Sequence, residues 1–189
     1  MIEDRSVESR KQYRSDNLAR REMGGRSSSV FPIPSREAVN SEGEDSQKQA
    51  NIRVLGKSLA KQSLAIIPKI KELDTFLREH PKYKFRILES HPEVAFARMN
   101  RAVVKSRKKD IVGFIERGHI LSYYLSAENL SGLREKAKTL GCNPDDIMDA
   151  TCLAVTAALN AHGLCETIPP VPEMDRYGFL MKMTVPKKR

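Results

Sequence analysis

The length and composition of the chain argue against a membrane-spanning protein and against a secreted one. Its 189 residues, 40% of them hydrophobic, are enough for one domain with a real core, and no apolar stretch is long enough to span a bilayer. The net charge of +9 fits a polyanionic partner such as nucleic acid about as well as it fits an ordinary basic protein. The charged N-terminus has no apolar core, so it is not a signal peptide, and three cysteines without zinc-ligand spacing favour the reducing cytoplasm.

The first part of the chain, residues 1–50, is interpreted as a charged segment followed by a Ser- and Pro-rich loop. Residues 24–36, "GGRSSSVFPIPSR", have the composition of a loop, and we expect Phe31 and Ile33 within it to dock on the body. The polar residues 40–51 are expected to be mobile. Residues 51–189 are therefore assigned to the folded domain.

A helix is the first regular element that the pattern predicts in this domain. Apolar residues recur at helical spacing over residues 52–80, with Pro68 as a break or kink. Helices with a few interspersed strands indicate an α/β domain. The later predicted elements are helices over residues 110–125 and 128–140, a last helix that Asn143 caps and Gly163 ends, and a strand over residues 179–185.

The segment "KFRILE" (84–89) predicts a short strand with a carboxylate on its apolar face. Side chains alternate along a strand, so Phe85, Ile87 and Glu89 share one face. Ser90 with Glu93 three residues later then predicts a capping box at the start of a helix. Glu93 is explained by that cap, whereas Glu89 is either an edge carboxylate paired with a basic residue or an oxygen ligand of a metal ion.

Three aspartates begin the last helix. Asp145 and Asp146 lie in its first turn, where the helix dipole favours acids, but Asp149 lies beyond that turn and precedes an apolar run. A carboxylate there is unfavourable unless it is paired, solvated or bound to a metal. Residues three apart on a helix are neighbours, so Asp146 and Asp149 project to one side, and a divalent cation relieves the repulsion between them. With Glu89 they make a set of oxygen donors suited to Mg²⁺ or Mn²⁺.

A basic run without any acid covers residues 98–109, "RMNRAVVKSRKK". One interpretation is a solvated loop, and the other is a phosphate-contacting stripe for nucleic acid. No aromatic residue interleaves the run, so base stacking is not predicted. The candidate nucleic-acid-binding residues are Lys105, Arg107, Lys108 and Lys109.

Taken in order, these segments resemble domain-of-unknown-function family 429, a family of predicted nucleases of the RNase H-like superfamily. The resemblance covers nearly the whole chain and rests on the stretches "RSDNLARREMGGRSSSVFPIPSR", "GKSLAKQSLAIIPKIKELD", "LESHPEVAFARMN", "DDIMDATCLAVTAAL" and "IPPVPEMDRYGFLMKMTVP". It implies an RNase H-like mixed sheet with flanking helices. In that superfamily, a central-strand carboxylate and carboxylates on a late helix hold divalent metals at the scissile phosphate.

By position, the resemblance makes Glu89 the strand carboxylate and Asp146 and Asp149 the late-helix pair. All three would be catalytic metal ligands for Mg²⁺ or Mn²⁺, and the reaction would be phosphodiester hydrolysis. The family's early Gly-x-Asp strand segment is absent here, so the resemblance also implies that the N-terminal part of the sheet is missing.

A sheet without its first strands would expose an edge and an apolar face. We then expect association as a homo-oligomer, or with a complementing polypeptide that supplies the N-terminal strands. The alternative function is a non-catalytic nucleic-acid- or partner-binding remnant that binds through the basic stripe. A third interpretation is a gene fragment without function.

Overall fold

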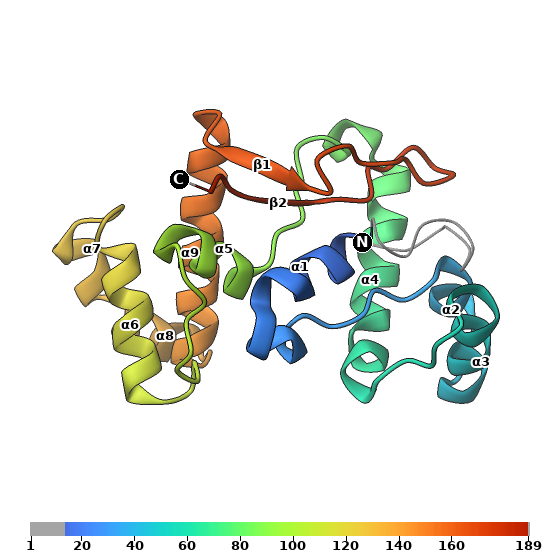
Figure 1. The fold of residues 1–189 in the computed structure, drawn as a ribbon, viewed down its shortest axis with the longest axis horizontal. Helices are drawn as coiled ribbons and strands as arrows, with labels where there is room; N and C mark the ends of the chain where they lie inside the picture. The colour runs from blue at the N-terminus through green and yellow to red at the C-terminus, as the bar shows by residue number, and fades with distance from the viewer. Residues whose placement is uncertain (1–13, 189) are drawn as a thin grey trace. The chain divides into compact units, whose positions relative to one another are not determined.

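The structure is a computed structural model that describes residues 14–188 (Figure 1). The fold is mixed α/β and mostly helical, and the described strands form one two-stranded sheet. The described residues divide into two compact units, each made of separate chain segments. Unit 1 contains residues 14–21, 27–89 and 167–183, and unit 2 contains residues 22–26, 90–166 and 184–188.

Unit 1 is built around three helices. α2 packs against both α3 and α4, and their small and aliphatic side chains make its core. Ser35 caps α2, because its Oγ accepts a hydrogen bond from the backbone N–H of Ala38. The helical elements that lie wholly or mainly in this unit are α1 (Ser15–Met23), α2 (Arg36–Asn40), α3 (Glu44–Leu55), α4 (Lys61–Glu79) and the 3₁₀ helix η3 (Pro81–Tyr83). A further 3₁₀ helix, η2 (Gly24–Ser29), follows α1.

Unit 2 is a helical unit with one long central helix, α9 (Pro144–Ala161), against which α5, α6 and α8 pack (Figure 1). Its core includes the fully buried Phe96, Leu121 and Cys152. Pro144 at the first helical position fixes the start of α9, as its missing N–H needs no partner there. The other helices are α5 (Pro92–Asn100), α6 (Ile111–Leu121), α7 (Ala127–Ser131) and α8 (Leu133–Leu140).

The sheet pairs β1 (Cys165–Ile168) with β2 (Met183–Pro186). All four residues of β2 are buried. An isolated antiparallel bridge joins Met174 and Leu180 in the connecting segment. The predicted final strand over residues 179–185 is therefore confirmed in part, and it starts later than predicted.

The predicted helices of unit 2 are confirmed, with one difference. The helix predicted over residues 128–140 is divided at Gly132 into α7 and α8. In unit 1 the prediction was less accurate. α3 occupies part of the segment predicted to be mobile, and it ends at Gly56, whose φ of 66° is accessible to glycine. The helical stretch predicted over residues 52–80 is interrupted after Leu55, and α4 runs from Lys61 to Glu79 through Pro68 without a break there.

The strand predicted over residues 84–89 is wrong. The backbone N–H groups there bond within the local turn: Lys84 donates to Pro81 O at 3.1 Å, and Arg86 donates to Tyr83 O at 2.9 Å. These local hydrogen bonds replace the ladder that a strand needs. The side chain of Phe85 is 68% exposed, so this segment has no buried apolar face at Phe85.

The predicted capping box at Ser90 is also wrong, because His91 is the N-cap of α5. The RNase H-like sheet and the division of the chain at residue 50 stay predictions, although α3 runs across residue 50 within unit 1. The first 13 residues of the predicted N-terminal segment lie outside the described residues.

Candidate functional site

Two aspartates of α9 in unit 2 share one lysine. Lys108 Nζ donates a hydrogen bond to Asp149 Oδ2 at 2.7 Å and lies 3.3 Å from Asp145 Oδ2. Asp145 and Asp149 are four residues apart, so they are neighbours on one face of the helix. The structure thus brings the predicted ligand Asp149 together with the predicted phosphate contact Lys108. The carboxylate beside Asp149 on this cation is that of Asp145, whereas the sequence had paired it with Asp146.

The surroundings of the Asp149 carboxylate act on its pKa in opposing directions. Its side chain is 20% exposed, and its Oδ1 is buried without a hydrogen-bond partner among the described residues. Burial raises the pKa of Asp149 above its ordinary value; Lys108 lowers that pKa, and the charge of Glu93 raises it. Burial lowers the pKa of Lys108, but its hydrogen bonds and attraction to Asp149 and Asp145 outweigh burial, so that pKa is raised. Within the described part of the chain, Asp149 Oδ1 is therefore the unsatisfied part of this carboxylate.

Glu93 and Arg117 form a buried ion pair beside this site. Arg117 is 1% exposed, and its Nη2 donates to both carboxylate oxygens of Glu93, at 2.7 and 2.8 Å. The same guanidinium donates to the backbone oxygens of Gly113, at 3.0 Å, and Ser106, at 3.4 Å. Arg117 on α6 therefore fixes both Glu93 on α5 and the loop that carries Lys108.

The closeness of α6 to this basic loop depends on Gly113. A Cβ at that position would lie 1.9 Å from the carbonyl oxygen of Arg107. Any side chain at residue 113 would therefore push the loop away from the helix. The glycine allows the loop to lie flat on α6, with its lysine reaching the α9 carboxylates.

Asp146 has a different role from its neighbours in the structure. Its side chain is exposed, and its Oδ2 accepts hydrogen bonds from the backbone N and the Nδ2 of Asn143, at 3.3 and 3.1 Å. This is the reciprocal pattern of a capping box at the start of α9. The position of Asp146 is thus accounted for by helix capping.

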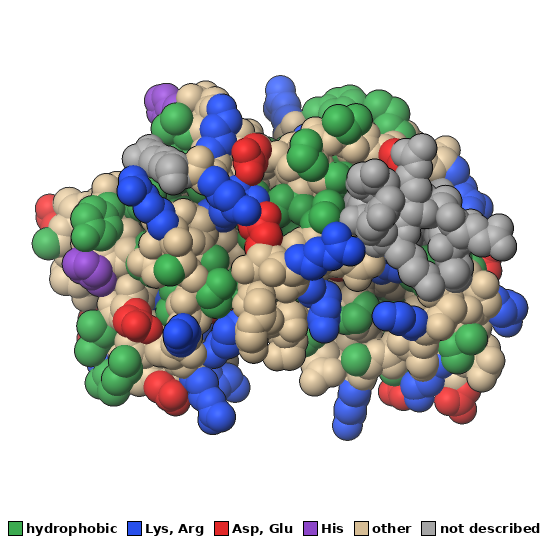
Figure 2. Space-filling model, viewed as in Figure 1, with side chains coloured by type: hydrophobic (Ala, Val, Ile, Leu, Met, Phe, Trp, Pro, Cys, Tyr) green, Lys and Arg blue, Asp and Glu red, His purple; other side chains and the backbone are tan. Residues whose placement is uncertain are grey.

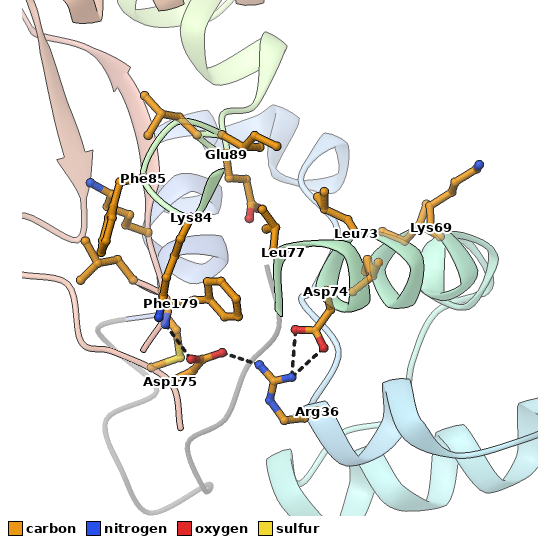
Figure 3. A pocket seen from close by; sticks show the side chains of 17 residues that line it. Arg36, Lys69, Leu73, Asp74, Leu77, Lys84, Phe85, Glu89, Asp175 and Phe179 are labelled. Carbon is orange, nitrogen blue, oxygen red and sulfur yellow. Dashed lines mark hydrogen bonds and ion pairs between the residues drawn. The ribbon is translucent and has the colours of Figure 1, made fainter. Parts of the chain in front are cut away.

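Glu89 belongs to unit 1, where it lines a largely apolar pocket with a volume of about 500 Å³ (Figure 3). Leu73 and Leu77 of α4 line the same pocket. At its polar end, Arg36 is held between Asp74, at 3.0 Å, and Asp175, and its guanidinium lies 4.6 Å from the centre of the Tyr177 ring. The side chains here are mostly apolar, and apolar surface of this kind favours association or a ligand.

The basic run divides into exposed and buried members. Lys105, Arg107 and Lys109 are exposed, as a phosphate-contacting stripe requires. Arg98 is buried and holds Glu22 and Glu166 together, with two bonds of 2.6 Å to Glu22. Figure 2 shows Lys and Arg side chains scattered over the visible face, interspersed with acids, so charge alone does not single out one binding surface.

A comparison with family models decides the family. The model of the family described as "Protein of unknown function (DUF429)" matches residues 6–174. The chain belongs to this family. No curated protein and no solved structure matches this DUF429 chain. The resemblance drawn from the sequence motifs is therefore confirmed at the level of the family.

Two further observations concern metal binding and membrane-spanning helices in the DUF429 chain. Among residues 14–188, no cluster of three His, Cys, Asp or Glu side chains is placed to hold a metal ion. None of the helices in the same described part is both long and apolar enough to cross a membrane.

The residues that sequence reasoning missed in the DUF429 chain are Asp145, Glu93 and Arg117. Asp145 was assigned to the helix dipole and Glu93 to a cap. The available signal was the α9 spacing itself, since Asp145 and Asp149 are also neighbours, at four residues rather than three. Nothing in the sequence links Arg117 to Glu93, because the two residues are 24 positions apart and on different helices.

Proposed function

We propose that the chain is a divalent-cation-dependent phosphodiesterase of the RNase H-like type that acts on nucleic acid. The observation that carries the proposal is the Asp149 carboxylate. It is mostly buried, its pKa is raised by burial, and one of its oxygens has no hydrogen-bond partner among the described residues. Carboxylates whose pKa is shifted by burial and by a nearby charge are common at functional sites.

The α9 carboxylates fit part of a Mg²⁺ or Mn²⁺ site. Asp145 and Asp149 supply hard oxygen donors, and both already face one positive group, the Lys108 ammonium. Glu89, which the family resemblance implies as a further ligand, belongs to unit 1, so the site proposed in unit 2 is built from Asp145 and Asp149. Asp146 fits less well, because its carboxylate is used in the cap of α9. A bound metal ion would supply an activated water and stabilisation of the leaving oxygen.

The basic loop that carries Lys108 also supplies residues that would bind the substrate. Lys105, Arg107 and Lys109 are exposed and would bind and orient the phosphate backbone. Arg117 holds this loop through the carbonyl oxygen of Ser106. Lys108 pairs with Asp145 and Asp149 when no divalent cation is bound, so it competes with the metal ion for the same oxygens.

The test is calorimetric titration with Mn²⁺ and Mg²⁺, with cleavage of labelled DNA and RNA measured in parallel. We expect Asp149→Asn and Asp145→Asn to abolish the binding heat, and Lys108→Met to increase the affinity. Asp146→Asn is the matched control on the same helix; a loss of binding there would mean that Asp146 leaves its cap to bind the metal. Unchanged binding in Asp149→Asn would refute the proposal.

A second candidate is a nucleic-acid-binding unit without hydrolysis, and one observation favours it. Lys108 already pairs with both carboxylates, so a cation other than a metal ion offsets part of their charge. This candidate predicts salt-sensitive binding in EDTA that Asp149→Asn leaves unchanged. Binding that survives neutralisation of Lys105, Arg107 and Lys109 together would argue against it.

A further inference from the structure

Unit 2 has a concave surface, apart from the α9 carboxylates, with the chemistry of an anion site. A groove with a volume of about 450 Å³ lies among the end of α5, the turn after α6, the end of α9 and the end of β2. We call it the α5–α6 groove. Its charged lining residues are all basic, namely Arg98, Arg101 and Lys187, and no carboxylate is among its described lining residues. Arg101 also lines a cavity with a volume of about 320 Å³, whose other charged lining residues are Arg98, Lys188 and the acidic Glu22.

Arg101 adopts a backbone conformation that costs stability. It is the C-cap of α5 with φ 58° and ψ 8°, in the left-handed region, and it is the one described non-glycine residue with a positive φ. Glycine is the usual residue at such a helix end, because a Cβ is unfavourable there. Backbone outliers of this kind cluster at ligand sites. The strain at Arg101 places a guanidinium at the groove where glycine would be more stable.

An aromatic ring stands beside these cations. Tyr123 is 75% exposed, and it lines the groove with Tyr124. The Tyr123 ring is held edge-on to His119, with centroids 5.3 Å apart, and its hydroxyl lies 3.3 Å from His119 Nε2. An exposed, fixed aromatic ring next to basic side chains is the arrangement on which nucleic-acid bases stack.

We propose that the α5–α6 groove binds single-stranded nucleic acid, with Arg101 and Lys187 on phosphates and Tyr123 stacked on a base. Lys187 Nζ is held at the groove by a bond of 2.7 Å to the carbonyl oxygen of Gly163. The ring distinguishes this ligand from an acidic peptide, which would use the cations alone. The inference extends the proposed function, because it names the strand form of the substrate and a binding surface outside the α9 carboxylates.

The test is fluorescence anisotropy of labelled oligo(dT) and oligo(rU) of about 15 nucleotides, in EDTA and over a salt series. Arg101→Gly should weaken binding and lower the salt slope by about 0.7, the contribution of one phosphate on a single strand. The same variant should melt no lower than the wild type, because glycine relieves the strain. A loss of affinity together with an unchanged or raised Tm separates a binding role from a structural one.

A second set of variants tests the stacking role of Tyr123. Tyr123→Leu should weaken binding about tenfold, whereas Tyr123→Phe keeps the ring and should bind as the wild type does. Lys136→Ala, on the exposed face of α8, removes the same charge as Arg101→Gly and should leave the affinity within about twofold. A preference for oligo(rU) over oligo(dT) would identify RNA as the ligand, and the reverse would identify DNA.

Two results would overturn the inference. Wild-type affinity in both Arg101→Gly and Tyr123→Leu would show that nucleic acid does not use this groove. Equal competition by a mononucleotide such as AMP would mean that the ligand is a free nucleotide and not a strand. Either result leaves the metal titration of Asp149→Asn untouched, because these measurements are made in EDTA, so the two proposals fail separately.

Discussion

Breaking the buried ion pair between Glu93 and Arg117 should strongly destabilise unit 2, and replacing Arg117 with methionine tests this directly. The guanidinium is 1% exposed and donates three bonds to Glu93, with lengths of 3.1, 2.7 and 2.8 Å. Arg117→Met removes all three bonds. It leaves the Glu93 carboxylate, in a residue that is 6% exposed, with a contact of 3.9 Å to Arg26. A buried charge that loses its partner in this way costs about 3–5 kcal/mol.

The destabilisation expected for Arg117→Met can be divided between its causes by a double variant. Most of the cost in Arg117→Met comes from the stranded carboxylate, and not from the lost bonds. Removing that carboxylate as well, in Arg117→Met with Glu93→Leu, should therefore recover a large share of the loss. We expect the double variant to be at least about 1 kcal/mol more stable than Arg117→Met alone.

The assay must measure the unfolding of unit 2 by itself, and the reactivity of the Cys152 thiol reports on it. Its side chain is fully buried in the core of unit 2, so it reacts with thiol reagents when this unit opens. Urea titrations would follow both circular dichroism and thiol labelling in a background with Cys142→Ser and Cys165→Ser. Lys136→Met, on the surface of α8, is the control and should change the free energy of unfolding by less than about 0.5 kcal/mol. A loss below about 1 kcal/mol in Arg117→Met would refute the reasoning.

Three further predictions follow from particular residues. Gly113→Ala should lower the free energy of unfolding by about 1–3 kcal/mol in urea titrations, because its Cβ would lie 1.9 Å from Arg107 O, whereas Gly118→Ala on the same helix meets nothing within 4 Å and should gain up to about 1 kcal/mol. Burial raises the pKa of the Cys152 thiol, with Asp149 and Glu93 adding to the effect, so Cys152 should stay unlabelled at pH 8 in the native protein and react only after unfolding; fast native labelling would contradict this. Burial also raises the pKa of Asp149, so the folded state keeps a proton that the unfolded state releases. The free energy of unfolding of the wild type should therefore fall relative to Asp149→Asn as the pH rises from about 4 through the raised pKa, and thermal melts in a pH series with a constant difference would count against it.

Local signals explain which elements could be predicted from the sequence. The start of α9 is set by Asn143 and Pro144, and the end of α8 by Gly141 in the left-handed conformation, with φ 64°. Each of these acts on its own few residues, so no distant partner is needed to anticipate it. The elements of unit 2 were predictable for this reason.

The strand over residues 84–89 failed for the opposite reason. Alternation of apolar residues favours a strand only if a neighbouring strand supplies the ladder, and that condition is not local. In the structure the backbone of Lys84 and Arg86 bonds instead within the turn after Pro81. The predicted apolar face therefore never forms, and Glu89 lines a pocket with α4 side chains.

The sequence anticipated two residues of the candidate site, Asp149 and Lys108, but not the pairing between them. It missed Asp145, Glu93 and Arg117. Asp149 stood out because a carboxylate precedes an apolar helical run, and the structure gives it a raised pKa. Its partner Lys108 is 41 positions away within a run of similar cations, and nothing in the run distinguishes one lysine from the next. Only the packing of the basic loop on α6, which Gly113 permits, selects Lys108.

The buried Arg98 has a consequence for how the protein is made. Its guanidinium joins Glu22 near the end of α1, Glu166 in β1 and the carbonyl oxygen of Pro186 in β2. A ribosome that adds about 5–20 residues per second delivers Pro186 roughly 10–30 s after Glu22. During that interval Arg98 has only some of its acceptors, so unit 2 cannot reach its final packing while its last segment is still inside the ribosome. The maturation of unit 2 is thereby tied to the synthesis of residues 184–188.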